Sequence, residues 1–92
     1  MRSEPDQIGL RQEIVAEMAR EAHYEALRAR QQHAPFPTAH HGYAVILEEL
    51  DELWDEIKAK TPDKDRLREE ALQVAAAAIN FAVEVCEREG WE

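Results

Sequence analysis

Apolar residues recur at intervals of three and four positions in three segments of this chain, which predicts three amphipathic helices. The first helix is expected over residues 6–32, and two prolines around Phe36, Pro35 and Pro37, are expected to end it in a loop. Its apolar face is rich in alanine, so this helix is expected to approach a neighbour closely. That face comprises Ile8, Val15, Met18, Ala19, Ala22, Ala26 and Ala29.

The second helix is expected to begin after Thr38, a suitable N-cap residue, and to end near Lys60. Lys58 and Lys60 then lie at the negative end of the helix dipole, which favours cations. The apolar stripe of this helix comprises Tyr43, Ile46, Leu47, Leu50, Leu53, Trp54 and Ile57.

The third helix has the clearest start signal, with Thr61 expected as the cap and Pro62 at the first helical position. The helix is expected to run toward Glu89 and to stop at Gly90. It carries two apolar faces, which predicts burial on both sides. One face comprises Leu67, Ala71, Val74, Ala78, Phe81 and Val85, and the other Leu72, Ala76, Ile79, Val83 and Cys86.

These patterns predict an all-α helical bundle of about three main helices per chain. Three helices of one small chain do not readily cover both faces of the third, so we expect oligomerisation to complete the bundle. The length of 92 residues favours a single domain over residues 1–92.

Charge and cysteine content narrow the function. The net charge of −9 argues against binding to nucleic acid or to an anionic membrane surface. A single cysteine, Cys86, suits a reducing compartment, and neither a signal peptide nor a membrane-spanning run is recognisable. We therefore expect a soluble, cytoplasmic protein with no membrane or nucleic-acid partner.

A thin polar stripe separates the two apolar faces of the third helix. It comprises Glu70, Gln73, Asn80 and Glu84, which lie within one sector at about 100° per residue. Ala77 lies in the same sector and leaves room beside them. Polar groups flanked by apolar faces are costly to bury without partners, so this stripe is a candidate site.

The second and third helices are joined by a short connection, so we expect them to pack antiparallel. Glu52 and Glu70 are each nine positions from Thr61, which places them at the same height. Glu49 and Gln73 are each twelve positions from it, about one turn further along. The hairpin is therefore expected to present three carboxylates and one amide as a rectangle of oxygen atoms.

A cluster of oxygen ligands suits a hard divalent cation, Mg²⁺ or Mn²⁺. A di-iron site is disfavoured because no histidine lies three positions after Glu52 or Glu70. Protein-bound Mg²⁺ is commonly coordinated by a few carboxylates together with the phosphates of a substrate. A phosphorylated ligand is therefore favoured.

The pattern Glu49-x-x-Glu52, a spacer, then Glu70-x-x-Gln73 resembles that of the MazG-like all-α nucleoside triphosphate pyrophosphohydrolases. The signature of that family is Glu-x-x-Glu, a variable spacer and Glu-x-x-Asp. The run from His40 to Trp54 also resembles a MazG-type motif helix, and the resemblance covers about residues 38–86.

The resemblance implies metal-dependent hydrolysis of a nucleoside or deoxynucleoside triphosphate to the monophosphate and pyrophosphate, for nucleotide-pool sanitation or adjustment. Glu49, Glu52 and Glu70 would be metal ligands and catalytic residues, together with Gln73, which stands where the family usually has Asp. The resemblance also implies a homodimer or homotetramer.

Further residues are assigned roles under this hypothesis. Asn80 is expected to hydrogen-bond the base or sugar, and Glu48 or a ligand carboxylate to orient the attacking water. Cationic side chains near the hairpin turn are expected to contact the β- and γ-phosphates, and these are Lys58, Lys60, Lys64, Arg66 and Arg68. The base and sugar preference stay open.

Two other hypotheses remain at this point. Gln73 is compatible with a catalytically inactive binding or oligomerisation module of the same fold. The acidic surface is also compatible with a helical partner that masks a basic surface. Aromatic roles are open too: Phe36 either plugs the end of the bundle or stacks on a base, and Trp54 either packs at a core or subunit interface or stacks on a base.

Overall fold

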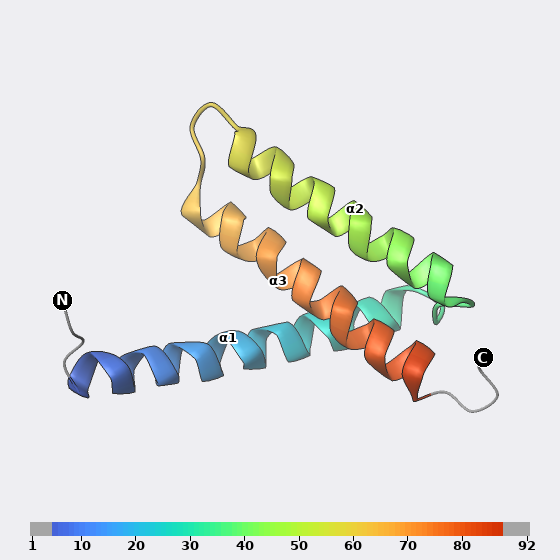
Figure 1. Cartoon of the computed structure of the whole chain (residues 1–92), viewed down its shortest axis with the longest axis horizontal. Helices are drawn as coiled ribbons and strands as arrows, with labels where there is room; N and C mark the ends of the chain where they lie inside the picture. Colours follow the sequence, from blue (N-terminus) through green and yellow to red (C-terminus); the bar gives the residue numbers. More distant parts are fainter. Residues whose placement is uncertain (1–4, 88–92) are drawn as a thin grey trace.

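The structure, a computed structural model, describes residues 5–87. It contains α1 (Pro5–Gln32), α2 (Ala39–Lys58), α3 (Lys64–Phe81) and η1 (Ala82–Cys86), a π-helical turn that continues α3. Residues 5–87 include no strand, so the all-α prediction with three main helices is confirmed. Helices α2 and α3 form an antiparallel hairpin, and α1 crosses the C-terminal half of α3 (Figure 1).

The predicted N-cap residue is correct for α2 but not for α3. Thr38 caps α2 as expected, because its hydroxyl accepts a hydrogen bond from the His41 backbone N–H at 3.0 Å. The prediction of Thr61 as the cap of α3 was wrong. Asp63 is the cap, and its carboxylate accepts from the backbone N–H of Asp65 at 2.8 Å. Aspartate caps at least as well as threonine, and Pro62 can then stay in the connection.

The C-terminal end of α3 also differs from the prediction. We expected one helix to continue toward Glu89, but the α-helical pattern ends at Phe81 and gives way to the wider turn of η1. The expected stop at Gly90 lies outside the described residues. The wider turn places Glu84 and Val85 against the rest of the fold, where both are buried.

The core of the chain is small and lies mainly where α1 crosses α3. The alanine-rich face of α1 allows the expected close approach, because Ala22 and Ala26 are buried, but Val15 and Ala19 are exposed. On α3 and η1, the polar stripe lies on the buried side. The buried apolar residues of the described chain are Ala22, Ala26, Ala76, Ala77 and Val85.

Gly42 allows the loop after α1 to pack against the end of α3. A Cβ atom at this buried glycine would lie 2.6 Å from a ring carbon of Phe81 and 3.0 Å from one of Phe36. A larger residue would therefore push the two rings apart. The Phe36 ring thus lies against the first turn of α2, and both of its expected roles stay predictions.

Many large apolar side chains remain exposed on the single chain. The α2 stripe keeps five of them at 42–63% exposure, and the second apolar face of α3 leaves Ile79, Val83 and Cys86 exposed. Helices α2 and α3 thus bury only part of their apolar surface within the chain. The five exposed residues of the α2 stripe are Tyr43, Leu47, Leu50, Trp54 and Ile57. Within residues 5–87, no helix combines the length and apolar character that crossing a bilayer requires.

Candidate metal site and adjoining pocket

Three glutamates converge where α2 faces α3. Glu49 and Glu52 lie one turn apart on α2, and Glu70 faces them from α3. One carboxylate oxygen from each residue lies within 4.8 Å of the other two. The expected register survives the wrong cap because Thr61 lies midway between the last residue of α2, Lys58, and the first residue of α3. Three corners of the predicted rectangle are therefore brought together.

The electrostatics of this cluster are unfavourable in the absence of a cation. Burial raises the pKa of Glu49, and the carboxylates of Glu52 and Glu70 raise it further. Burial also raises the pKa of Glu70, and Glu52 and other acidic neighbours add to this effect, while Arg66 opposes it. Arg66 is itself paired with Glu56 at 3.5 Å. The cluster therefore concentrates negative charge that nearby cationic side chains do not balance.

One oxygen of the cluster lacks a partner altogether. Glu70 Oε2 is buried and makes no hydrogen bond. A buried carboxylate oxygen without a partner is costly, and a bound cation would remove that cost. Carboxylate oxygens are the ligands that hard divalent cations prefer, so the three residues suit Mg²⁺ or Mn²⁺.

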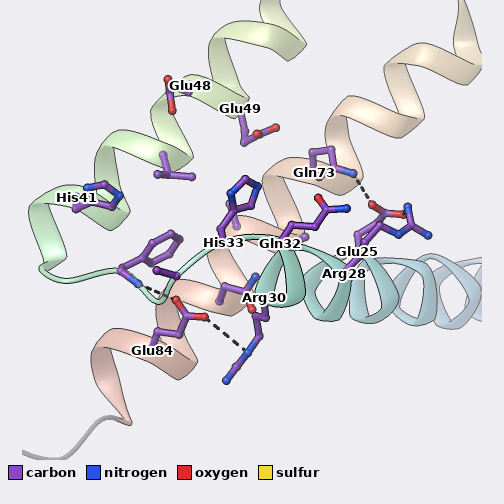
Figure 2. A pocket seen from close by; sticks show the side chains of 17 residues that line it. Glu25, Arg28, Arg30, Gln32, His33, His41, Glu48, Glu49, Gln73 and Glu84 are labelled. Carbon is purple, nitrogen blue, oxygen red and sulfur yellow. Dashed lines mark hydrogen bonds and ion pairs between the residues drawn. The ribbon is translucent and has the colours of Figure 1, made fainter.

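Gln73, the expected fourth member, is engaged by α1. Its Nε2 atom donates a hydrogen bond to Glu25 Oε1 at 2.7 Å, as Figure 2 shows. The other oxygen of Glu25 accepts from Arg28 at 2.8 Å. Neither Glu25 nor Arg28 belongs to a motif or stripe that is visible in the sequence. No short connection joins α1 to α3, so sequence spacing contains no signal that could have paired them.

A pocket of about 470 Å³ adjoins the carboxylate cluster, and Glu49 and Gln73 belong to its lining (Figure 2). The C-terminal part of α1, the loop after it, the first turns of α2 and the buried side of α3 form the walls. The walls supply acidic, basic and imidazole groups as well as apolar surface, and the acidic groups are Glu25, Glu48, Glu49 and Glu84. The lining includes Arg28, Arg30, His33, Phe36, His41 and Val45.

Asn80 lines this pocket and is only 5% exposed. Its Nδ2 atom donates to the backbone carbonyl of Ala26 at 3.1 Å, which fixes the orientation of the amide. Its Oδ1 atom is buried and has no hydrogen-bond partner. The pocket wall therefore contains a buried acceptor that is oriented by the fold and has no hydrogen-bond partner.

Glu84, the last member of the polar stripe, is also buried but has partners. Its Oε1 atom accepts from the Phe36 backbone N–H at 3.0 Å, and its Oε2 atom lies 3.7 Å from Nε of Arg30. Figure 2 shows both contacts converging from the loop and from α1. Glu84 therefore anchors the loop that forms one wall of the pocket.

The remaining predicted residues are divided between the pocket and the surface. Glu48 and His41 line the pocket. Lys58 lies 3.6 Å from Asp55 and stacks over the ring of Trp54 at 5.6 Å, and it does not line the pocket. Its expected phosphate contact therefore stays a prediction, as do the roles of Glu48 and Asn80.

Comparisons of the chain with protein-family models, with curated proteins and with solved structures found no match. The resemblance to the MazG-like family therefore rests on the residues of the two motifs and stays a hypothesis.

Proposed function

We propose that the chain is a Mg²⁺- or Mn²⁺-dependent pyrophosphohydrolase that converts a nucleoside or deoxynucleoside triphosphate to the monophosphate and pyrophosphate. Its role would be sanitation or adjustment of the nucleotide pool. One observation carries the proposal: a cluster of three carboxylates, with an unpartnered buried oxygen on Glu70, borders a pocket of about 470 Å³. A pocket of this size accommodates a nucleoside.

The carboxylates of Glu49, Glu52 and Glu70 would hold the cation. A bound divalent cation supplies charge neutralisation for the phosphate oxygens and polarises the phosphorus centre that is attacked. The chain's own residues then divide the remaining tasks. Glu48, next to the cluster on α2 and in the pocket lining, would orient the attacking water and accept a proton from it.

The pocket would receive the nucleoside. The buried Oδ1 atom of Asn80 offers an acceptor for an N–H or O–H group of the base or sugar. The half-buried ring of Phe36 offers apolar surface on the same lining. Arg28 and Arg30 on the same lining are paired with Glu25 and Glu84. The positive charge that an anionic substrate requires would therefore come mainly from the bound cation.

The proposal includes a homodimer or homotetramer. The Cα radius of gyration is 15.8 Å, whereas a compact domain of this length has a value of about 12 Å. The open shape and the exposed stripe of α2 leave apolar surface that a second copy can cover. Light scattering with Leu50→Glu, compared with Asp51→Lys on the neighbouring polar side, tests this part. Dissociation by Leu50→Glu alone supports it, and a monomeric native chain contradicts it.

A substrate panel tests the activity. Each common NTP and dNTP, together with dUTP and an oxidised purine triphosphate, is incubated with Mg²⁺, with Mn²⁺ or with chelator. We expect monophosphate and pyrophosphate that depend on the metal. Glu70→Gln should remove the activity, whereas Glu69→Gln, its exposed neighbour outside the cluster, should retain it. Orthophosphate as the first product, or turnover in chelator, would contradict the proposal.

Gln73 favours one second candidate, a catalytically inactive module of the same fold. The amide lowers the negative charge of the predicted ligand set, and its nitrogen is committed to Glu25. An inactive module predicts that no triphosphate turns over and that Mn²⁺ and nucleotide together leave the melting temperature unchanged. The enzyme proposal predicts that the two together raise it by mass action.

A further inference from the structure

The contact between α1 and the candidate metal site is a chain of three polar side chains. Arg28 donates to one oxygen of Glu25 at 2.8 Å, and Gln73 donates to the other at 2.7 Å (Figure 2). Glu25 and Gln73 are partly buried. Both oxygens of the Glu25 carboxylate are therefore engaged, which holds this side chain in one position between α1 and α3.

This arrangement determines which end of the Gln73 amide is free. An ionised carboxylate only accepts hydrogen bonds, so Glu25 can face the amide nitrogen of Gln73 and not its oxygen. The short distance of 2.7 Å is typical of a charge-assisted hydrogen bond. The amide oxygen of Gln73 is then the end that remains for a ligand. Gln73 lies one helical turn from Glu70 and borders the pocket beside Glu49.

The same contact explains why an amide suits position 73. A glutamate at this position would bring its carboxylate within hydrogen-bond distance of the Glu25 carboxylate. An aspartate is one methylene shorter, but it would still place two like charges near each other, and they would repel. The negative charge that an aspartate would bring to α3 is instead present on α1. Positions 25 and 73 therefore form a matched pair of one carboxylate and one amide.

We propose that Glu25 is a positioning residue for the divalent cation: it directs the Gln73 amide oxygen toward the cation held by Glu49, Glu52 and Glu70. This inference rests on the proposed function, because it assumes that the carboxylate cluster binds a metal. It assigns a role to α1 in the metal site. It also predicts that Gln73→Asp, which restores the motif of the resembling family, weakens the site in this chain.

Exchanging the two groups tests the proposal. Five chains are compared: the native chain, Gln73→Asp, Glu25→Gln, Gln73→Glu, and the double variant that carries Glu25→Gln and Gln73→Glu, in which both side chains keep their length. Mn²⁺ affinity is measured by calorimetric titration of the metal alone. Partners that orient metal ligands typically change affinity by about 10–100-fold, so each single variant should bind Mn²⁺ at least about 10-fold more weakly. The double variant should recover to within about 3-fold of the native chain, because its amide and carboxylate have only exchanged places.

The outcomes separate positioning from a merely structural role. Urea unfolding of the metal-free chains reports the structural contribution of the contact. If the single variants lower stability but bind Mn²⁺ as the native chain does, the contact is structural and the proposal is wrong. Losses that add up in the double variant also overturn it. Glu21→Gln, one turn earlier on α1 and exposed, removes the same charge without this contact and should leave Mn²⁺ affinity unchanged.

One further variant distinguishes failure of this inference from failure of the proposed function. Glu70→Gln alters the carboxylate cluster itself. If Glu70→Gln abolishes Mn²⁺ binding while changes at positions 25 and 73 have no effect, only the positioning role of Glu25 is lost. If the native chain and Glu70→Gln bind Mn²⁺ equally, both the metal site and the proposed function are wrong.

Discussion

Two glutamates on the same polar stripe, Glu70 and Glu84, have opposite surroundings. Glu84 is buried beneath the loop after α1, and both of its oxygens have partners, the Phe36 backbone N–H and the Arg30 guanidinium. Glu70 faces two further carboxylates of the hairpin, and one of its oxygens is buried without a partner. The contrast distinguishes a carboxylate whose two oxygens both have partners in the fold from one that keeps a buried oxygen without a partner.

The same contrast extends to the two ends of α3. At the crossing with α1, backbone and side-chain partners satisfy Glu84 and one end of the Asn80 amide. At the hairpin with α2, like charges face one another, and the pKa values of Glu49 and Glu70 are raised. The buried carboxylate at the α1 crossing therefore has partners, whereas the carboxylates of the hairpin repel one another.

The largest expected effect is that of the substitution Glu70→Gln on the turnover rate. Loss of a ligand carboxylate should reduce metal-dependent turnover by about 100-fold or more. The metal-free fold should not be destabilised, because the substitution removes repulsion from Glu49 and Glu52. Turnover assays and urea unfolding of the same preparation measure both quantities. If the variant loses stability as well as activity, Glu70 stabilises the fold, as Glu84 does.

Metal binding should have the next largest effect, on stability. Free Mn²⁺ at 100 times its dissociation constant should stabilise the native chain by about 2.7 kcal/mol. Thermal unfolding with Mn²⁺ and with chelator measures the difference. Glu70→Gln should show little of this stabilisation, whereas Glu69→Gln should behave as the native chain does. Equal stabilisation of Glu70→Gln would place the cation elsewhere.

Glu84→Ala should change the free energy of unfolding by an amount comparable to, or smaller than, the stabilisation by Mn²⁺. It should not act on the metal site. Removing the acceptor of the Phe36 N–H and the partner of Arg30 should destabilise the chain by about 2 kcal/mol. Glu87→Ala, an exposed glutamate after η1, is the matched control and should change stability by less than about 0.5 kcal/mol. Urea unfolding measures both. Equal stability of the two variants would show that Glu84 does not anchor the loop.

The smallest expected effect is the pH dependence of the metal-free chain. The pKa values of Glu49 and Glu70 are raised above the ordinary value of 4.5, so the folded chain binds more protons than the unfolded chain. These two groups therefore stabilise the fold fully below pH 4.5, and this contribution is lost as pH rises through their raised pKa values. Urea midpoints at pH 5 and pH 7 in chelator measure it, and Glu70→Gln should flatten the dependence.

The candidate metal site was largely predictable because it lies within one hairpin. Helical periodicity places Glu49 and Glu52 on one face, and a short connection sets their height relative to Glu70. The misplaced cap did not alter this register, because α2 ends and α3 begins at equal distances from Thr61. Cap choice was less predictable, since Thr61 and Asp63 are both good caps and their difference in free energy is small.

The sequence by itself determined the three helices, the antiparallel hairpin and the group of three carboxylates, because each follows from interactions between residues close in the chain. Tertiary structure alone decided where α1 crosses α3. That crossing brings Glu25 to Gln73 and Arg30 to Glu84, and it leaves the Asn80 oxygen buried without a partner. The physical reason is that periodicity specifies which face of a helix is apolar, whereas packing of side chains distant in sequence sets which residues of two helices meet.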